Sequence, residues 1–261
     1  MQQDDPAPTA ACLLIGDELL SGRTQDKNAH HLAGVLHERG IALVEIRVVP
    51  DEAPAIIEAV QALSSKADLV FTSGGIGPTH DDITADAVAR AFDTPIAERD
   101  DAVALLDDYY RRKGETLTEA RRRMARIPKG AALIENTVSA APGFKLGNVY
   151  VMAGVPAIFS AMLEAIQDDL PRGPEETAFS VIGEAKESTL AAALLDLQTA
   201  LKGLKIGCYP GPTGTGGPLA VVCRSRHAPT AEQAALAVKG LFAAQGVDAV
   251  IEDGHHRPAK R

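Results

Sequence analysis

Short apolar runs alternate with longer amphipathic segments through the first two thirds of the chain. Ala10–Ile15 is typical of a buried strand, and Asn28–Arg39 places its apolar residues on one helical face before Gly40. The further predicted strands are Ala42–Val49, Leu69–Thr72, Ala132–Ile134 and Val149–Met152, and the further predicted helices are one from Ala53, Ile83–Phe92, Ala102–Arg112, Thr118–Arg126 and Ala157–Leu170. This alternation predicts a three-layer α/β/α domain built around a mostly parallel sheet.

A domain boundary is predicted at residues 171–174, where two prolines and a glycine fall within four positions. Beyond it the predicted elements follow the order βαββαβ, which is typical of a small α+β ferredoxin-like domain. Its strands are Ala178–Gly183, Lys205–Tyr209, Leu219–Arg224 and Val247–Glu252, and its helices are Ser188–Leu201 and Thr230–Ala244. We therefore expect domains at 10–171 and 175–253, with disordered ends at 1–9 and 254–261.

The composition indicates a globular protein: 46% of the 261 residues are hydrophobic and 23% are charged. With 26 basic and 35 acidic residues the net charge is -9, so the chain lacks the electrostatic footprint of a general DNA or RNA binder. The three cysteines have no metal-ligand spacing, which suits a reduced cytosolic protein. The N-terminus does not resemble a signal peptide, and no apolar stretch is long enough to span a bilayer. We expect a soluble, cytoplasmic protein.

A glycine-rich segment follows the predicted strand Leu69–Thr72, at the end where α/β sheets bind their ligands. Residues 71–84 have the sequence FTSGGIGPTHDDIT. Gly74, Gly75 and Gly77 allow backbone N–H groups to approach an anion closely, and the helix that follows adds the positive end of its dipole. This pattern predicts a phosphate-binding turn.

Two carboxylates close the same segment. Asp81 and Asp82 would repel a bound phosphate unless a divalent cation lay between them, so the segment indicates a metal–phosphate site of the magnesium type. The alternative is a tight strand–helix turn that the aspartates cap. His80, beside Asp81, is either a metal ligand or a polar loop residue.

A second polar cluster, GDELLSG at residues 16–22, follows the first predicted strand. If the two strands are parallel, this cluster lies at the same edge of the sheet as the glycine-rich turn. Asp17 and Glu18 can reach a metal or a ribose hydroxyl, whereas Asp26 can simply cap the next helix. The arginines at 121, 122, 123 and 126 are either a phosphate clamp or, as we favour, a solvated helix face.

Together these motifs resemble those of the molybdopterin-binding (molybdenum-cofactor biosynthesis) domain superfamily, and most of all the N-terminal part of the competence/damage-inducible protein A (CinA-like) family. The matching features are residues 16–22 with Asp26 and Asn28, residues 72–84, Asn136 with residues 141–144, and residues 154–156. The resemblance spans roughly residues 10–170, and the second region resembles that family's KH-like or ferredoxin-like module.

The resemblance implies roles for particular residues. In the family the Gly-Gly-x-Gly turn binds a nucleotide-like phosphate or pyrophosphate, and the closing acidic residue supports metal binding and phosphoryl chemistry. Carried over, this gives catalytic roles to Asp82, Asp81 and Asp17, and metal binding to Asp82 and Asp81. The implied substrate-binding residues are Gly16, Glu18, Asn28, Ser73, Gly74, Gly75, Gly77, Thr79, Thr84, Asn136, Gly143, Gly154 and Pro156.

The chain departs from the family pattern in two ways. Longer relatives carry a C-terminal nicotinamide-mononucleotide amidohydrolase domain, and this chain ends where that domain would begin, so deamidation is not expected. Met152-Ala153 also stands where relatives often have Leu-Pro, and the usual glycine before Ala141-Pro-Gly is missing. Either change can alter the ligand pocket.

Related members with this architecture hydrolyse the pyrophosphate of ADP-ribose or FAD-like dinucleotides with a divalent metal. The resemblance therefore implies a nucleotide pyrophosphatase that acts on ADP-ribose or a similar dinucleotide with Mg, Mn or Co as its divalent metal. The alternatives are a pterin- or nucleotide-binding module without hydrolytic activity, and a molybdopterin adenylyltransferase. The expected partners are a small-molecule nucleotide or pterin and further copies of the chain, since relatives form dimers or trimers. No membrane partner is expected, and DNA is disfavoured by the net charge.

Overall fold

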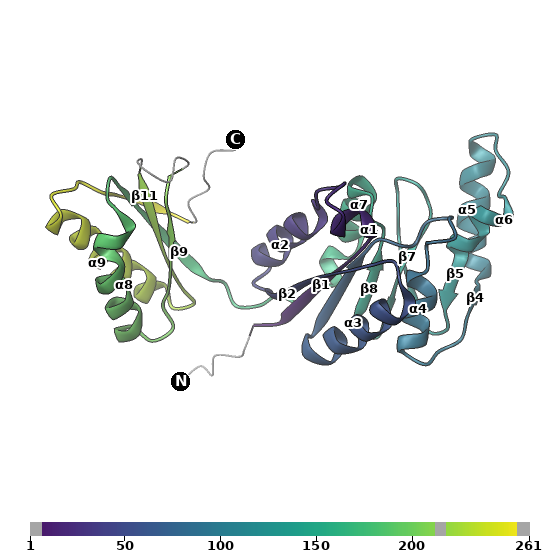
Figure 1. Ribbon diagram of the computed structural model, residues 1–261, viewed down its shortest axis with the longest axis horizontal. Helices are drawn as coiled ribbons and strands as arrows, with labels where there is room; N and C mark the ends of the chain where they lie inside the picture. The colour runs from purple at the N-terminus through teal and green to yellow at the C-terminus, as the bar shows by residue number, and fades with distance from the viewer. Residues whose placement is uncertain (1–6, 212–217, 255–261) are drawn as a thin grey trace. The chain divides into compact units, whose positions relative to one another are not determined.

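The computed structural model describes residues 7–211 and 218–254. The chain divides into two compact units, the first ending at Gly173 and the second beginning at Pro174. Each unit has its own sheet and its own hydrophobic core (Figure 1).

The first unit is built on a six-stranded sheet in the order β2-β1-β3-β8-β7-β6. These strands are β2 (Ala42–Val49), β1 (Thr9–Ile15), β3 (Leu69–Ser73), β8 (Val149–Met152), β7 (Gly143–Leu146) and β6 (Ala132–Ile134). The first four are parallel, and β7 runs antiparallel to both of its neighbours. The sheet is therefore mostly parallel, as the alternation of elements predicted.

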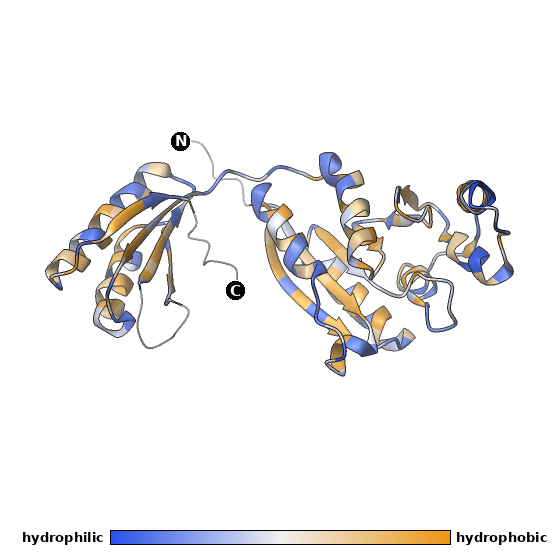
Figure 2. Cartoon of the chain, turned by 90° about the horizontal axis from the view of Figure 1, so that it is seen from above, coloured by the Kyte–Doolittle hydropathy of each residue, from blue (hydrophilic) through white to orange (hydrophobic). Residues whose placement is uncertain are grey.

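Helices cover both faces of this sheet, which gives three layers. In β1, Ala11, Leu13 and Ile15 face one core, whereas the alternate residues Ala10, Cys12 and Leu14 face the other. The first core contains α3 (Ala53–Lys66) and α4 (Thr84–Ala91), and the second contains α2 (Asn28–Glu38) and α7 (Pro156–Ile166). The buried strands are mainly apolar and the outer helix faces are polar (Figure 2).

Between α4 and β6 the chain leaves the sheet and forms a separate excursion. It contains β4 (Ile96–Glu98), α5 (Asp100–Arg112), the short α6 (Glu119–Arg122), a 3-10 turn at Arg123–Ala125 and β5 (Arg126–Pro128). The predicted helix Thr118–Arg126 is thus wrong in its second half. Ile127 is buried and β5 pairs antiparallel with β4, so tertiary pairing outweighs the local helical pattern.

Other boundaries also differ from the prediction. The helix expected at Ala157–Leu170 is α7, which ends at Ile166 and continues as a 3-10 turn over Gln167–Asp169. The short helix α1 (Asp17–Leu20) and the strand β7 were not predicted. Thr9 belongs to β1 rather than to a disordered end, because its N–H and hydroxyl both donate to Asp68 Oδ2, at 2.8 and 2.7 Å.

The second unit has a four-stranded antiparallel sheet in the order β10-β11-β9-β12. Its elements are β9 (Thr177–Gly183), α8 (Glu187–Ala200), β10 (Lys205–Tyr209), β11 (Leu219–Ser225), α9 (Ala228–Ala244) and β12 (Val250–Asp253). This is the ferredoxin-like βαββαβ arrangement. The last strand begins three residues later than predicted, because Val247 N–H donates to Phe242 O and completes the end of α9.

Residues 1–6 and 255–261, which were predicted to be disordered, lie outside the described residues. Residues 212–217, which include a glycine-rich stretch, also lie outside them. Within the part of the chain that the structure describes, no helix combines the length and apolar character that a membrane crossing requires.

Candidate functional site

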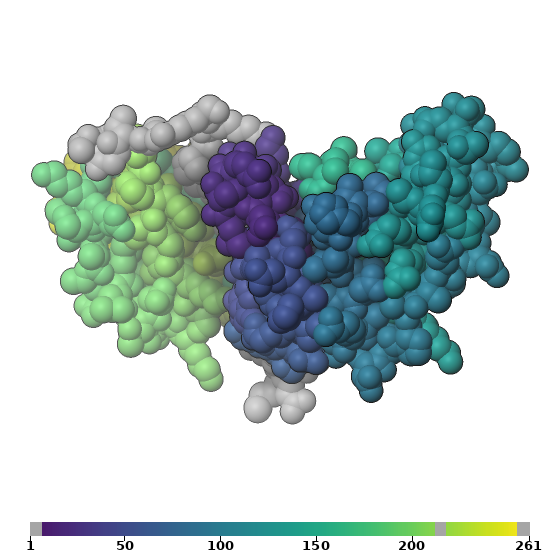
Figure 3. Space-filling view, turned by 45° about the vertical axis from the view of Figure 1, so that its right-hand side comes forward, coloured from purple at the N-terminus to yellow at the C-terminus, as the bar shows by residue number. Residues whose placement is uncertain are grey.

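The carboxyl ends of the four parallel strands meet at one edge of the first sheet. Gly16 follows β1, Asp51 follows β2 after a proline, Gly74 follows β3, and Gly154 follows β8 after one alanine. Loops from these ends line a pocket of ≈ 530 Å³. In the space-filling view, the purple residues after β1 and the blue residues around the glycine-rich turn lie on either side of a hollow in the surface (Figure 3). Ligands of open α/β sheets bind at this edge.

The glycine-rich turn has no room for side chains. Gly75 has a φ of +68°, and a Cβ built on it would lie 2.1 Å from Thr84 Oγ1. A Cβ on Gly74 would lie 2.2 Å from Ile15 O, and a Cβ on Gly154 would lie 3.3 Å from the Gly74 Cα. The loops after β1, β3 and β8 therefore pack backbone against backbone. The Gly74 N–H donates to Met152 O at 3.1 Å, whereas among the described residues no hydrogen bond engages the N–H groups of Gly75, Ile76 and Gly77.

Asn28 joins these loops through its side chain. Its Nδ2 donates to Ser73 Oγ at 2.8 Å and to Gly154 O at 2.7 Å. Asn28 is buried at the start of α2, where the Asp26 carboxylate accepts the N–H groups of Asn28 and Ala29. Asp26 thus caps the helix, as one of the sequence interpretations held. Asn28 and Ser73 support the loops from beneath and do not themselves line the pocket.

Asp82 both shapes the turn and faces the pocket. Its Oδ2 accepts the backbone N–H of Thr79 at 2.8 Å and also the Thr79 hydroxyl. A Cβ on Gly77 would lie 2.6 Å from the same oxygen. Among the described residues no hydrogen bond reaches Oδ1. Asp82 therefore holds the turn with one oxygen and leaves the other available to a ligand. It does not cap α4, whose N-terminus receives no hydrogen bond from a capping side chain.

An acidic group of three further side chains lines the pocket together with Asp82. Asp51 Oδ2 accepts the backbone N–H of Asp17 at 3.0 Å, and Asp51, Glu18 and Asp81 all line the pocket. Partial burial raises the pKa of the Asp51 carboxyl, and the charges of Glu18, Asp17 and Asp81 raise it further. Sequence analysis missed Asp51. Its position just after a predicted parallel strand is the signal that could have found it.

These carboxylates do not form a complete metal site by themselves. In residues 7–211 and 218–254 no three His, Cys, Asp or Glu side chains come close enough together to hold an ion. Mg²⁺ usually binds through one or two carboxylates together with substrate phosphates and water. Asp81 and Asp82 at the pocket fit such shared binding. The His80 side chain is 100% exposed, as expected of a polar loop residue.

The structure brings about half of the predicted site residues to the pocket wall. Those that line it are Glu18, Gly74, Gly75, Gly77, Asp81, Asp82, Asn136, Gly154 and Pro156, whereas Gly16, Asp17, Asn28, Ser73, Thr79, Thr84 and Gly143 do not. Asn136 also holds its own loop, since its Nδ2 donates to Ser139 Oγ and Ala141 O. A Cβ on Gly143 would lie 2.5 Å from Val151 O, so this glycine serves packing of β7 on β8. Wall residues not singled out from the sequence include Thr24, Met124 and Ile158.

Most of the arginine cluster is engaged in ion pairs. Arg121 pairs with Glu115 at 2.5 Å and Arg122 with Glu98 at 2.6 Å, while Arg126 pairs with Asp86. These contacts agree with the solvated-face interpretation for Arg121 and Arg122. Arg123 and Arg126 differ, because both line a small recess together with Gly77 and Asp82.

A family comparison agrees with this geometry. Residues 11–172 match the model of a family described as a probable molybdopterin binding domain. The chain belongs to this family. The match covers the six-stranded sheet apart from the first two residues of β1, and it includes every loop that lines the pocket.

Similar proteins come from archaea and bacteria. A protein of Pyrococcus furiosus is 31% identical over 239 residues, which cover 86% of this chain and 93% of that protein. A CinA-like protein of Geobacter sp. strain M21 is 37% identical over 191 residues, 70% of this chain but 46% of its own length. The structure of the protein CinA, of unknown function, from Thermoplasma acidophilum has a TM-score of 0.58 at 34% identity and covers 62% of this chain and 98% of its own. The first unit of the chain is thus similar to CinA-like proteins. The chain spans less than half of the length of the Geobacter relative.

Proposed function

We propose that this molybdopterin-binding-domain protein is a metal-dependent nucleotide pyrophosphatase that acts on ADP-ribose or a similar dinucleotide. The observation that carries the proposal is the pairing of side-chain-free backbone at Gly74 and Gly75 with the carboxylates Asp81 and Asp82 on one pocket wall. The N–H groups of Gly75 and Gly77, which make no hydrogen bond among the described residues, favour phosphate oxygens, and the carboxylates favour a cation that neutralises them.

The pocket has the size and the mixed lining that a dinucleotide requires. Its ≈ 530 Å³ falls within the usual range of small-molecule sites. Ile15, Met124 and Ile158 supply apolar wall to a base, whereas the glycine-rich turn supplies polar backbone to the diphosphate. Helix α4 begins at Thr84, two residues beyond Asp82, so its positive end also favours the diphosphate.

Asp81 and Asp82 would hold the divalent cation together with phosphate oxygens of the substrate. Such a cation polarises a phosphoryl oxygen and lowers the pKa of bound water. In the overall reaction water adds across the P–O–P bond, so ADP-ribose yields AMP and ribose 5-phosphate. The residues of the chain bind and orient the diphosphate, and the Asp82–Thr79 contacts keep the turn in its shape.

The test incubates the protein with ADP-ribose or FAD, with and without Mg²⁺, Mn²⁺ or Co²⁺, and measures the released AMP by chromatography. Asp82→Asn keeps an oxygen that can accept the Thr79 hydrogen bonds but loses the charge. We expect it to retain the fold and lose turnover by about 100-fold or more. Asp108→Asn, an exposed aspartate of α5 outside the pocket, is the control and should retain turnover. Unchanged turnover in Asp82→Asn would remove Asp82 from the catalytic machinery.

A second candidate is a pterin- or nucleotide-binding module without hydrolytic activity. The observation that favours it is the lack, among the described residues, of three converging metal ligands. This candidate predicts a thermal shift on addition of ADP-ribose or a pterin, with no AMP released under any of the three metals.

A further inference from the structure

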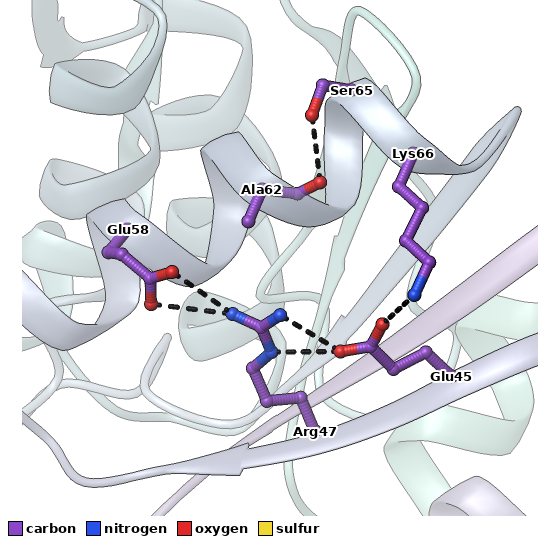
Figure 4. Close-up of polar contacts among 6 residues, drawn as sticks. All are labelled: Glu45, Arg47, Glu58, Ala62, Ser65 and Lys66. Atoms are coloured by element: carbon purple, nitrogen blue, oxygen red, sulfur yellow. Dashed lines mark hydrogen bonds and ion pairs between the residues drawn. The ribbon is translucent and has the colours of Figure 1, made fainter.

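The guanidinium of Arg123 is an exposed cation without an acidic partner. Arg123 begins the 3-10 turn that joins α6 to β5, and among the described residues no hydrogen bond or ion pair reaches its side chain. Arg47 shows the contrast, since its Nη2 lies 2.9 Å from Glu45 Oε1 and its Nη1 lies 3.3 Å from Glu58 Oε1 (Figure 4). An arginine that no carboxylate occupies can bind a phosphate through its fork of N–H groups.

The backbone that carries Arg123 is held in place by its neighbours. Ala125 is buried, and its carbonyl oxygen accepts the Arg99 N–H at 3.0 Å. On the other side of Arg123, Arg122 Nη2 lies 2.6 Å from Glu98 Oε2. The position of the Arg123 backbone is therefore set before a ligand binds, and binding needs to order only the Arg123 side chain.

The small recess that Arg123 lines is an extension of the glycine-rich turn. The residues that line both this recess and the main pocket are Gly75, Ile76, Gly77, Asp82 and Met124. The recess measures ≈ 20 Å³, which is room for one water-sized group and not for a second ligand. Arg126 also lines the recess, but it is paired with Asp86. A ligand group that is held at the turn therefore meets Arg123 as the unpaired cation of the recess.

The main pocket needs a positive charge that its own wall does not supply. Glu18, Asp51, Asp81 and Asp82 line it, and among its described lining residues there is no lysine, arginine or histidine. A diphosphate brings two further negative charges, as many as one divalent cation neutralises, so the four carboxylates stay uncompensated. Like charges that share a partly buried site repel one another. A cation beside the turn reduces this repulsion, and Arg123 is placed to provide it.

We propose that Arg123 binds a phosphate oxygen of the substrate diphosphate at the glycine-rich turn. The inference rests on the proposed function, because it requires a diphosphate at this turn. Asp81 and Asp82 with their cation then neutralise one phosphate, and Arg123 neutralises the other. When water adds across the P–O–P bond, each phosphate becomes a monoester and gains negative charge. Arg123 therefore stabilises the transition state more than the bound substrate.

Calorimetric titration of the full chain with α,β-methylene ADP-ribose in Mg²⁺ tests the contact. A CH₂ group replaces the bridging oxygen of this probe, so binding is measured without cleavage. We expect Arg123→Gln to raise the Kd by about 10-fold or more, because a charged hydrogen bond is lost. Arg123→Lys keeps the charge without the fork and should have an intermediate Kd. Added salt should weaken binding more in the natural chain than in Arg123→Gln, a difference that a merely structural role would not produce.

Arg122→Gln is the matched control. It removes the same charge from the neighbouring position, but Arg122 lines neither the recess nor the pocket, so the Kd should not change. An unchanged Kd in Arg123→Gln, or an equal rise in Arg122→Gln, would overturn the proposal.

AMP release from ADP-ribose, measured on the same proteins, separates this proposal from the proposed function. Probe binding that depends on Arg123 without any AMP release would overturn the pyrophosphatase activity and support the Arg123 contact. AMP release with equal probe binding by the natural chain and Arg123→Gln would do the reverse. A natural chain that does not bind the probe would overturn both.

Discussion

Gly75 lies where backbone conformation and space both exclude a side chain. With φ at +68° and Thr84 Oγ1 2.1 Å from a built Cβ, alanine must strain the backbone and displace Thr84. We expect Gly75→Ala to lose about 1–3 kcal/mol of stability and to weaken ADP-ribose binding, measured by chemical denaturation and calorimetry.

Gly114 separates the two causes of that loss. It has a φ of +72°, but a Cβ would meet no atom within 4 Å. Gly114→Ala should therefore lose only the conformational share, about 1 kcal/mol, and bind ADP-ribose normally. Equal binding by Gly75→Ala and Gly114→Ala would show that the glycine-rich turn does not hold the ligand.

Asp51 predicts a pH dependence of stability. Its pKa is raised in the folded chain, so its charge opposes folding once the pH exceeds the ordinary aspartate value of about 3.9. Asp51→Asn removes that charge and keeps an oxygen for the Asp17 N–H. We expect the melting temperatures of variant and natural chain to agree near pH 3 and the variant to become the more stable as the pH rises through the raised pKa.

Asp108 provides a control of opposite sign. Hydrogen bonding from Arg111 and the charge of Arg112 lower the pKa of the Asp108 carboxyl, so its charge favours folding. Asp108→Asn should be the less stable protein near neutral pH and should approach the natural chain as the pH falls. If Asp51→Asn instead followed the course of Asp108→Asn, the account of the acidic group would be wrong.

At the residue scale, the sequence located the segments that form the site but did not show which residues line the pocket and which support its loops. The pattern of glycines and aspartates located the turn at the pocket, because glycines directly after a strand of an α/β sheet fall at the carboxyl edge of that sheet. It could not separate Asn28 and Ser73, which hold the loops from beneath, from Gly74 and Gly75 at the wall. That distinction depends on which side of a loop faces the pocket, and a linear pattern does not contain it.

At the scale of elements, the contact between α2 and the end of the first unit gives a test. Gly173 N–H donates to Arg39 O at 2.8 Å, and a Cβ on Gly173 would lie 2.0 Å from Gly40 O. Gly173→Ala must push this segment away from the end of α2, at a cost of about 1–3 kcal/mol. Hydrogen exchange of the full chain, read by mass spectrometry, should show faster exchange at the C-terminal end of α2.

Gly34 is the matched control within the same helix. It is exposed, and a built Cβ meets nothing within 4 Å. Gly34→Ala should slow exchange in α2 and stabilise it by about 0.5–1 kcal/mol, because alanine is the better helix former. Slower exchange in both variants would contradict the packing described for Gly173.

The bounds of helices and strands were predicted most accurately where the pattern of apolar residues is regular along the element. Ala42–Val49, Ala132–Ile134 and Lys205–Tyr209 have the predicted bounds, because apolar periodicity and flanking breakers agree there. Arg126, the first residue of β5, was assigned to the end of a helix instead, since β5 exists only through pairing with Ile96–Glu98, a segment distant in the sequence. Short strands made by one tertiary contact leave little local signal.

At the scale of the whole molecule, the parallel strands of the first unit and the helices that cover them follow from the sequence, whereas α1, β4, β5 and β7 do not. Strand–helix alternation requires a parallel sheet with covered faces, and a parallel sheet places all its carboxyl ends at one edge. The glycine-rich turn, Asp51 and Gly154 therefore meet although they lie far apart in the chain. The size and lining of the pocket did not follow, because they depend on the excursion that brings Met124 to its wall.

Phosphorus NMR of ADP-ribose incubated with the full chain and Mg²⁺ tests the central claim most directly. The account predicts that the two diphosphate signals disappear and that two phosphomonoester signals, of AMP and ribose 5-phosphate, take their place. This conversion should require both the protein and the metal. Diphosphate signals that broaden on binding but never convert, with Mg²⁺, Mn²⁺ or Co²⁺ present, would contradict hydrolysis and leave a pocket that binds without cleaving.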